Sequence, residues 1–119
     1  MSMLTFTARA VAAEERRDLN TFVVVLAENQ DGSGARLELQ KALCLDEQDR
    51  KLEMDTYCLC TEEGATFYGG IKSWKLMSDL LEINLDMQAA EALGVQGFAI
   101  SFSAKDFAML EEGLAKVLG

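Results

Sequence analysis

Histidine and proline are both missing from the 119 residues of this chain. Histidine is the side chain whose unperturbed pKa lies nearest neutrality, and it is a frequent general base and metal ligand. Its absence excludes Ser-His-Asp and Cys-His catalytic arrangements and every imidazole metal site. The composition therefore points away from an enzyme before any motif is considered.

Positive charge is scarce as well. The chain has 11 Lys and Arg residues against 20 Asp and Glu residues, which gives a formal net charge of −9. Nucleic acids and anionic membrane surfaces are bound by clustered Lys and Arg side chains. We therefore expect no nucleic acid and no membrane among its partners, and we expect a partner recognised through charge to be basic.

Long apolar runs are absent, and cysteines are few. No apolar run approaches the ~20 residues that cross a bilayer, and residues 1–6 lack the basic and apolar regions of a secretory signal. Of the three cysteines, Cys58 and Cys60 stand two apart, which on a strand places both thiols on one face in a poor geometry for a mutual disulfide. These features predict a reduced, cytoplasmic protein.

The remaining composition is that of a folded domain. Half of the residues are hydrophobic and 26% are charged, which is typical of globular chains rather than disordered ones. No repeat, low-complexity tract or proline-rich linker divides the sequence. We therefore expect a single domain that spans residues 1–119.

Apolar residues recur with a period of two in the first third of the chain. This pattern predicts a first strand at about 3–11, followed by a charged, solvated connection at 14–18. The β-branched run at 22–26 is apolar on both faces and predicts a central strand. An Asp31-Gly32 turn then leads into its hairpin partner, which includes Leu37 and Leu39.

The second part of the chain predicts further short strands after a polar loop at 46–55. These strands lie at 57–60, 66–68, 71–77, 81–85 and 98–102. The first two form a hairpin, and Gly69-Gly70 lets the chain bend before the third.

Two helices complete the prediction. Asp86 is a suitable N-cap for a short helix at 87–93 that ends at Gly94. Residues 103–106 resemble a capping box, and apolar residues then fall at helical spacing along one face up to Leu118. The predicted fold class is α+β, with an antiparallel, mostly meandering β-sheet of about seven or eight strands, one short helix, and a C-terminal amphipathic helix packed on the sheet.

No catalytic, cofactor or metal site follows from the motifs. The cysteines lack a neighbouring base, and we expect the carboxylates of Asp55, Glu62 and Glu63 to raise their pKa, so they are interpreted as small apolar residues. The crowded acidic residues at 46–55 include no Gly and do not follow the pattern of a calcium loop. Gly32-Ser33-Gly34 lies between strands, where no helix N-terminus is available for a phosphate.

Excess acid and aromatic residues meet in one segment. Residues 46–63 contain seven acidic and two basic residues, a net charge of −5, which can steer a basic partner. The alternative is that this charge only keeps the protein soluble. Tyr57 and Tyr68 are candidate interface anchors, whereas alternation places Phe67 in the core and leaves Trp74 open between core and surface.

A family resemblance is carried by Met54-Asp55-Thr56-Tyr57-Cys58-Leu59, by Tyr68-Gly69-Gly70, and by Ala89-Ala90-Glu91-Ala92-Leu93-Gly94. From about residue 22 to the C-terminal helix, this order of features resembles the bacterial immunity protein 10 family, the cognate antidotes found beside toxins of polymorphic toxin systems. The sequence departs from the expected pattern at Glu53, where a Gly is expected just before Met54.

The resemblance implies a small, non-catalytic, cytoplasmic protein without a cofactor that binds one toxin domain and blocks it. Our hypothesis for the contact residues assigns steering to four acidic residues and anchoring to two tyrosines. They are Asp46, Glu47, Asp49, Asp55, Tyr57 and Tyr68. A structural or homo-oligomeric interaction module, such as a homodimer, stays open as an alternative, and an enzyme that uses two carboxylates is a third.

Overall fold

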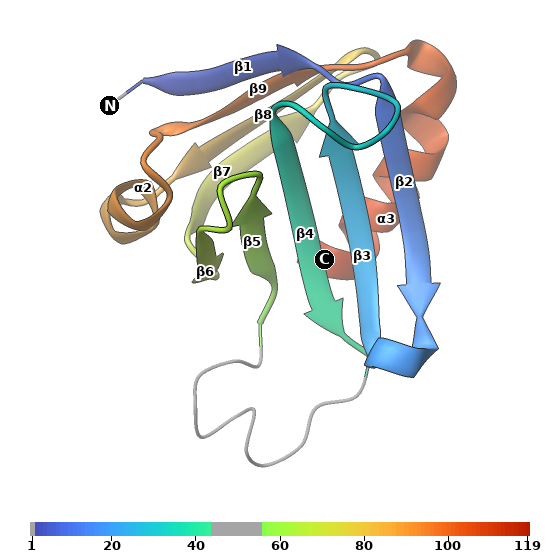
Figure 1. The fold of residues 1–119 in the computed structure, drawn as a ribbon, viewed down its shortest axis with the longest axis horizontal. Coiled ribbons are helices and arrows are strands. Elements are labelled where there is room, and N and C mark those ends of the chain that lie inside the picture. Colours follow the sequence, from blue (N-terminus) through green and yellow to red (C-terminus); the bar gives the residue numbers. More distant parts are fainter. Residues whose placement is uncertain (1, 44–55) are drawn as a thin grey trace.

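The computed structural model describes residues 2–43 and 56–119. Within these residues, the chain forms nine β-strands in two sheets and two α-helices (Figure 1). The predicted α+β fold class is confirmed, with 47% of the described residues in strands. The strands number nine rather than seven or eight, and they form two separate sheets rather than one meander.

The larger sheet has five antiparallel strands in the order β2-β3-β4-β5-β6. Its strands are β2 (Ala10–Arg16), β3 (Thr21–Ala27), β4 (Arg36–Ala42), β5 (Cys58–Thr61) and β6 (Thr66–Tyr68). The run at 22–26 is a central strand, as predicted, because β3 lies between β2 and β4. The predicted hairpins β3–β4 and β5–β6 are also confirmed.

The smaller sheet has four strands in the order β1-β9-β8-β7. They are β1 (Met3–Thr7), β7 (Ile71–Leu76), β8 (Leu80–Leu85) and β9 (Gly97–Ser101). All neighbours are antiparallel except β1 and β9, which run parallel, so the first and last strands of the chain lie side by side.

Two details near the N-terminus differ from the prediction. The strand expected at 3–11 is divided at Ala8, and its two parts join different sheets. Residues 14–16, expected in a solvated connection, belong to β2. They are charged because β2 is an edge strand whose end is open to solvent, and the guanidinium of Arg16 donates to the carboxylate of Glu14 there.

Gly69-Gly70 carries the chain from the larger sheet to the smaller one, which confirms the predicted bend. Both residues have positive φ, +75° and +91°, a region that glycine enters without steric penalty. A Cβ at Gly70 would lie 2.4 Å from the Cβ of Ala89. Glycine therefore lets the short helix α2 (Met87–Leu93) approach this turn closely.

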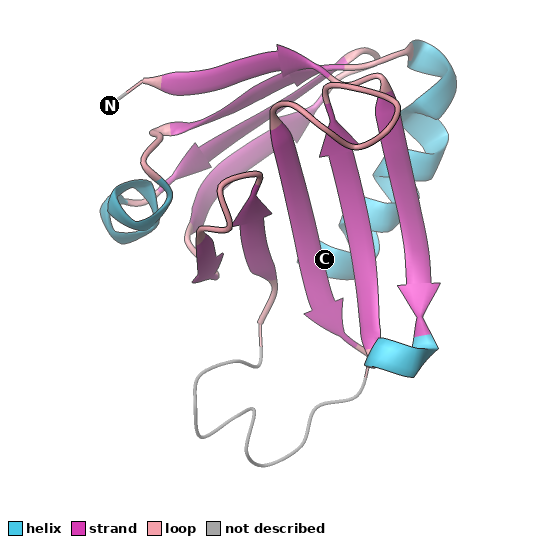
Figure 2. Ribbon diagram, viewed as in Figure 1, coloured by secondary structure: helices cyan, strands magenta, loops and turns pink. Residues whose placement is uncertain are grey.

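The core is enclosed by the inner faces of both sheets and by α3 (Phe107–Leu118) (Figure 2). The predicted apolar face of α3 is confirmed, because Leu110, Leu114 and Val117 are buried. Gly113 brings this helix against β2 and β3, where a Cβ would lie 2.8 Å from the Cβ of Ala13.

The helix boundaries are confirmed for α2 and corrected for α3. The carboxylate of Asp86 accepts a hydrogen bond of 2.8 Å from the backbone N of Ala89, and Gly94 ends α2 with a positive φ. The predicted capping box at 103–106 is wrong, since the side chain of Ser103 makes no capping hydrogen bond. A 3-10 turn forms instead, in which the backbone N of Asp106 donates to the carbonyl of Ser103.

Candidate functional site

On the face of the five-stranded sheet that points away from the core, no α-helix of the described residues packs. Its residues form two cross-strand rows, which we call the outer face: Glu14, Val23, Gln40, Cys58 and Tyr68 in one row, and Ala12, Val25, Glu38, Cys60 and Thr66 in the other. Both α-helices approach the opposite side, where Gly113 of α3 contacts Val24 and Ala89 of α2 lies near Phe67 and Gly70. Figure 1 looks onto the outer face, with α3 behind it.

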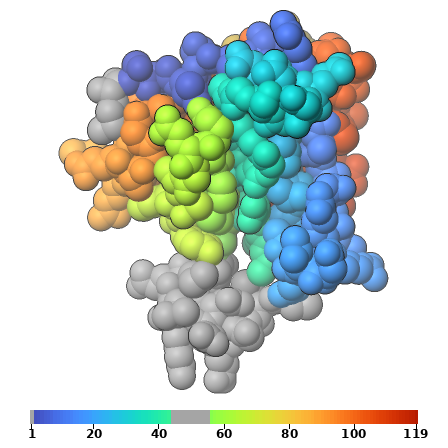
Figure 3. All heavy atoms as spheres, in the orientation of Figure 1, coloured from blue at the N-terminus to red at the C-terminus, as the bar shows by residue number. Residues whose placement is uncertain are grey.

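The middle of the outer face is apolar. Val23 and Cys58 are each 8% exposed, although no α-helix of the described chain lies over them. Val23 and Val25 line a groove of about 330 Å³, bordered by the longer side chains of Arg16, Leu19 and Gln40 among others. Figure 3 shows this side of the molecule, with β5 and β6 on one side of β4 and with β3 and β2 on the other. The groove can therefore accept an apolar group.

The charged side chains around the groove are engaged with one another. The Glu14 carboxylate accepts from the Arg16 guanidinium at 2.6 Å. The Glu38 carboxylate accepts from the Gln40 amide at 2.7 Å and also from the Arg36 guanidinium. Because these polar groups already have partners, covering them with a second protein leaves few of them unsatisfied.

The two tyrosines predicted as anchors lie on opposite sides of this sheet. Tyr68 belongs to the outer face and is 41% exposed. Tyr57 is half-buried against the core, and its hydroxyl oxygen accepts a 2.9 Å hydrogen bond from the backbone N of Ile71. Tyr57 therefore fixes the start of β7. Of the two tyrosines, only Tyr68 lies on the same face of the sheet as the apolar groove.

The four acidic residues predicted to steer a partner, Asp46, Glu47, Asp49 and Asp55, lie outside the described residues. The structure places other carboxylates at the end of the sheet where β3 turns into β4 and β5 into β6, in the turns at 28–35 and 62–65. They belong to Glu28, Asp31, Glu62 and Glu63. The carboxylates of Glu28 and Glu62 accept hydrogen bonds from the adjacent backbone N atoms of Ala35 and Arg36, at 3.1 and 3.2 Å.

Ser33 stabilises the ionised form of one of these acids, Asp31. Its hydroxyl and its backbone N both donate to the carboxylate of Asp31, at 2.6 and 3.0 Å, and these bonds lower the pKa of that carboxyl. Neither of the turns at 28–35 and 62–65 contains a Lys or Arg. At this end of the outer face the four carboxylates outnumber the neighbouring Arg36, whose guanidinium is paired with Glu38, and we call these four carboxylates the acidic rim.

Two free thiols lie side by side on the outer face, as the spacing of Cys58 and Cys60 predicts. Their Sγ atoms are 3.7 Å apart. The hydrogen bond from Cys60 lowers the pKa of Cys58 from 9.0 to about 7, and the same bond, together with burial, raises the pKa of Cys60. The expectation that nearby carboxylates raise the pKa of both thiols is therefore wrong for Cys58, because its nearest polar neighbour is a thiol donor.

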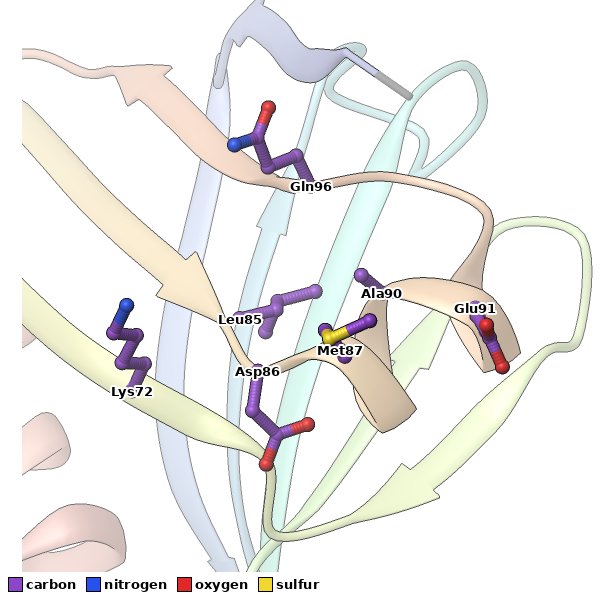
Figure 4. A pocket seen from close by; sticks show the side chains of 7 residues that line it. All are labelled: Lys72, Leu85, Asp86, Met87, Ala90, Glu91 and Gln96. Atoms are coloured by element: carbon purple, nitrogen blue, oxygen red, sulfur yellow. The ribbon is translucent and has the colours of Figure 1, made fainter.

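A second hollow, of about 700 Å³, lies beside α2 and is drawn in Figure 4. Leu85, Met87 and Ala90 give it an apolar floor, and Met87 is 81% exposed. Its two carboxylates come from different turns of the chain: Asp86 precedes α2 and caps it, while Glu91 lies on the far side of Met87 and Ala90 (Figure 4). Asp86 is thus engaged in holding the helix.

Among the described residues, no group of three or more Cys, Asp or Glu side chains is arranged to hold a metal ion. In the same part of the chain, no helix has the length and apolar character needed to cross a membrane. What the described structure does contain is an apolar sheet face with engaged polar borders and an exposed aromatic residue, the composition of a protein–protein contact surface.

The family model for immunity protein 10 matches residues 7–109, which is most of the chain. The chain belongs to the immunity protein 10 family. Proteins of an immunity family act by binding a toxin and are generally non-catalytic. No curated protein and no solved structure matches the chain.

The sequence interpretation missed most of the outer face, including Val23, Val25, Glu38 and Gln40. One signal was present in the run at 22–26, which is apolar on both faces. This pattern predicts a central strand, which the structure confirms, and among the described residues α-helices cover only one side of that strand, β3. An antiparallel strand that is apolar on its uncovered side marks a contact surface.

Proposed function

We propose that this protein binds one cognate bacterial toxin domain in the cytoplasm and neutralises it by occlusion, without catalysis and without a cofactor. The observation that carries the proposal is the family match over residues 7–109. The outer face supports it, because occlusion requires a rigid scaffold with an exposed, complementary patch and no reactive group. Antiparallel pairing across all five strands supplies that rigidity.

The test uses the toxin domain encoded by the reading frame next to this chain. A catalytically inactive variant of that domain is mixed with the protein, and the complex is measured by calorimetry and light scattering. We expect a one-to-one complex, and we expect co-expression of the protein to restore growth to cells that produce the active toxin. Absence of both binding and protection would contradict the proposal, and a tight homodimer that excludes the toxin would favour the oligomeric alternative.

The charge of the chain suggests how the toxin approaches. We propose that Asp46, Glu47, Asp49 and Asp55 steer a basic toxin domain to the protein, in the segment of net charge −5. Reversing Asp46, Glu47 and Asp49 to Lys is expected to lower the association rate by about 10-fold at low salt and to flatten its salt dependence.

The matched control reverses three exposed acids elsewhere, Glu91 on α2 and Glu111 and Glu112 on α3. This control changes the net charge by a similar amount without altering the segment at 46–55. Equal association rates for both variants and the wild type would show that the acidic segment serves solubility alone.

A further inference from the structure

The molecule presents two sheet faces to solvent, and they differ in chemistry. The outer face of the five-stranded sheet is apolar in its middle, as described above. The corresponding face of the four-stranded sheet, which we call the polar face, carries the partly exposed Met3 and Leu80 at its ends, and its other side chains are small or polar: Thr5, Thr7, Ser73, Lys75, Glu82, Asn84, Ala99 and Ser101. Among these, the amide of Asn84 donates to the Ser73 hydroxyl at 3.3 Å.

We infer that the toxin domain docks on the outer face of the five-stranded sheet, placing an apolar or aromatic side chain over Val23 and Val25 and Lys or Arg side chains against the acidic rim. This inference rests on the proposed function and adds to it the contact surface and the chemistry of the toxin segment that it accepts.

Burial supports this choice of face. Ordinary solvated sheet faces alternate, and the polar face does so, with buried Leu81 and Ile83 on one side of β8 and Glu82 and Asn84 on the other. On β3 the alternation fails, because Val23 and Val25 are apolar and line an open groove. Val23 is 8% exposed and Val25 is partly exposed, so a partner group that fills the groove gains contacts with both side chains.

The hydrogen bonds among the polar side chains of the outer face also support docking on this face. The Glu38 carboxylate is held by Gln40 on its own strand and by Arg36, and Arg16 is held by Glu14. These side chains therefore lose little conformational freedom when a partner covers them. Tyr68 adds a large, rigid side chain at the edge of the face, of the type that anchors protein interfaces.

Charge indicates what kind of partner fits. The acidic rim adds four carboxylates at one end of the outer face, with no Lys or Arg in either turn. A toxin segment with basic side chains beside its apolar group complements this arrangement. A second copy of this chain fits less well, because pairing would bring together two molecules that each carry a net charge of −9.

The test places the same substitution on both faces. Thr66 of β6 and Thr5 of β1 are exposed threonines on strands at the edges of their sheets, so Thr66→Arg and Thr5→Arg are matched. Affinity for the inactive toxin domain is measured by calorimetry, and thermal melting confirms that both variants are folded. Thr66→Arg is expected to weaken binding by roughly 30-fold or more, while Thr5→Arg stays within about 2-fold of the wild type.

Each outcome has a distinct meaning. If the wild type binds the toxin and Thr66→Arg binds it equally well, the inference is overturned. The same holds if Thr5→Arg abolishes binding, and in both cases the proposed function stands. A wild-type chain that does not bind the toxin overturns the proposed function as well. If the wild type does not bind the toxin but self-associates, and Thr66→Arg removes that self-association, a second copy is the occupant of the outer face. That result also overturns the inference.

Discussion

The polar face of the four-stranded sheet is hydrated, whereas the outer face of the five-stranded sheet, on which we infer that the toxin docks, is apolar in its middle. In the four-stranded sheet, Leu81 and Ile83 are buried and Glu82 and Asn84 face outward, so one side builds the core and the other stays hydrated. In the five-stranded sheet, Val24 and Leu26 fill the core, yet Val23 and Val25 on the other side are also apolar. The contrast teaches that apolar residues beyond those the core needs locate a contact surface.

The largest expected effect concerns the core that supports both faces. Leu39 of β4 is 0% exposed beneath the five-stranded sheet, and Leu39→Ala should lower the free energy of unfolding by about 2–5 kcal/mol because it leaves a cavity. The single Trp, Trp74, lies in the four-stranded sheet and reports on that sheet by fluorescence. For Leu39→Ala, the urea midpoints measured by circular dichroism and by Trp74 fluorescence should decrease together. An unchanged fluorescence midpoint would show that the sheets unfold separately.

A somewhat smaller effect is expected at the turn that joins the sheets. Gly64 and Gly70 both have positive φ, but a Cβ at Gly64 would meet nothing within 4 Å, whereas at Gly70 it would lie 2.4 Å from Ala89. Gly64→Ala should reduce the free energy of unfolding by about 1 kcal/mol through backbone strain. Gly70→Ala should reduce it by roughly 2–4 kcal/mol, because overpacking adds to the strain. If urea titrations show the same loss of unfolding free energy for both variants, α2 moves to accommodate the added Cβ and does not fix the turn.

The third prediction compares one exposed aromatic residue from each sheet. Tyr68 is 41% exposed on the outer face, and Trp74 is 40% exposed on the edge strand β7. Tyr68→Ala should weaken toxin binding by about 2 kcal/mol, roughly 30-fold, because it removes an anchor. Trp74→Ala should leave affinity unchanged in the same calorimetric measurement. If Trp74→Ala has the larger effect, the contact surface lies on the other sheet.

The smallest expected effect is a dependence of stability on pH from the thiol pair. Because the pKa of Cys58 falls from 9.0 to about 7 in the folded chain, the unfolded chain binds more protons between these values, so the free energy of unfolding should rise with pH across that range. The raised pKa of Cys60 has the opposite sign, and stability should decrease above about pH 9. Urea titrations at several pH values test this, and Cys60→Ala should remove the rise because Cys58 then loses its hydrogen-bond donor.

Much of the fold follows from the sequence, because local chemistry specifies it. The Asp86 cap, the Gly94 stop, the hairpin turns and the apolar face of α3 each depend on residues close together in the chain. The division into two sheets does not, because it depends on the parallel pairing of β1 with β9, whose residues lie more than 90 positions apart. No local signal distinguishes that pairing from an extension of β1 into β2.

The candidate site was only partly predictable for a similar reason. Tyr68 was named from its type and its place in a strand, and the structure puts it on the outer face. Tyr57 was named on the same grounds, but its hydroxyl bonds the backbone of Ile71, 14 residues away, which no pattern near it reveals. To predict the apolar groove, one must know that α3 covers the opposite side of β3. The pattern at 22–26 does not contain this tertiary contact.

The most direct measurement asks whether the toxin covers the outer face. Cys58 lines a small hollow on that face beside Gln40 and Tyr68, and its lowered pKa raises its thiolate fraction near neutral pH. In a Cys44→Ser background, the rate of alkylation of Cys58 and Cys60 by iodoacetamide is measured by mass spectrometry, with and without saturating inactive toxin domain. We expect the toxin to slow alkylation by about 10-fold or more, because the complex covers the hollow that Cys58 lines and the partly exposed Cys60. An unchanged rate in the saturated complex would contradict this expectation.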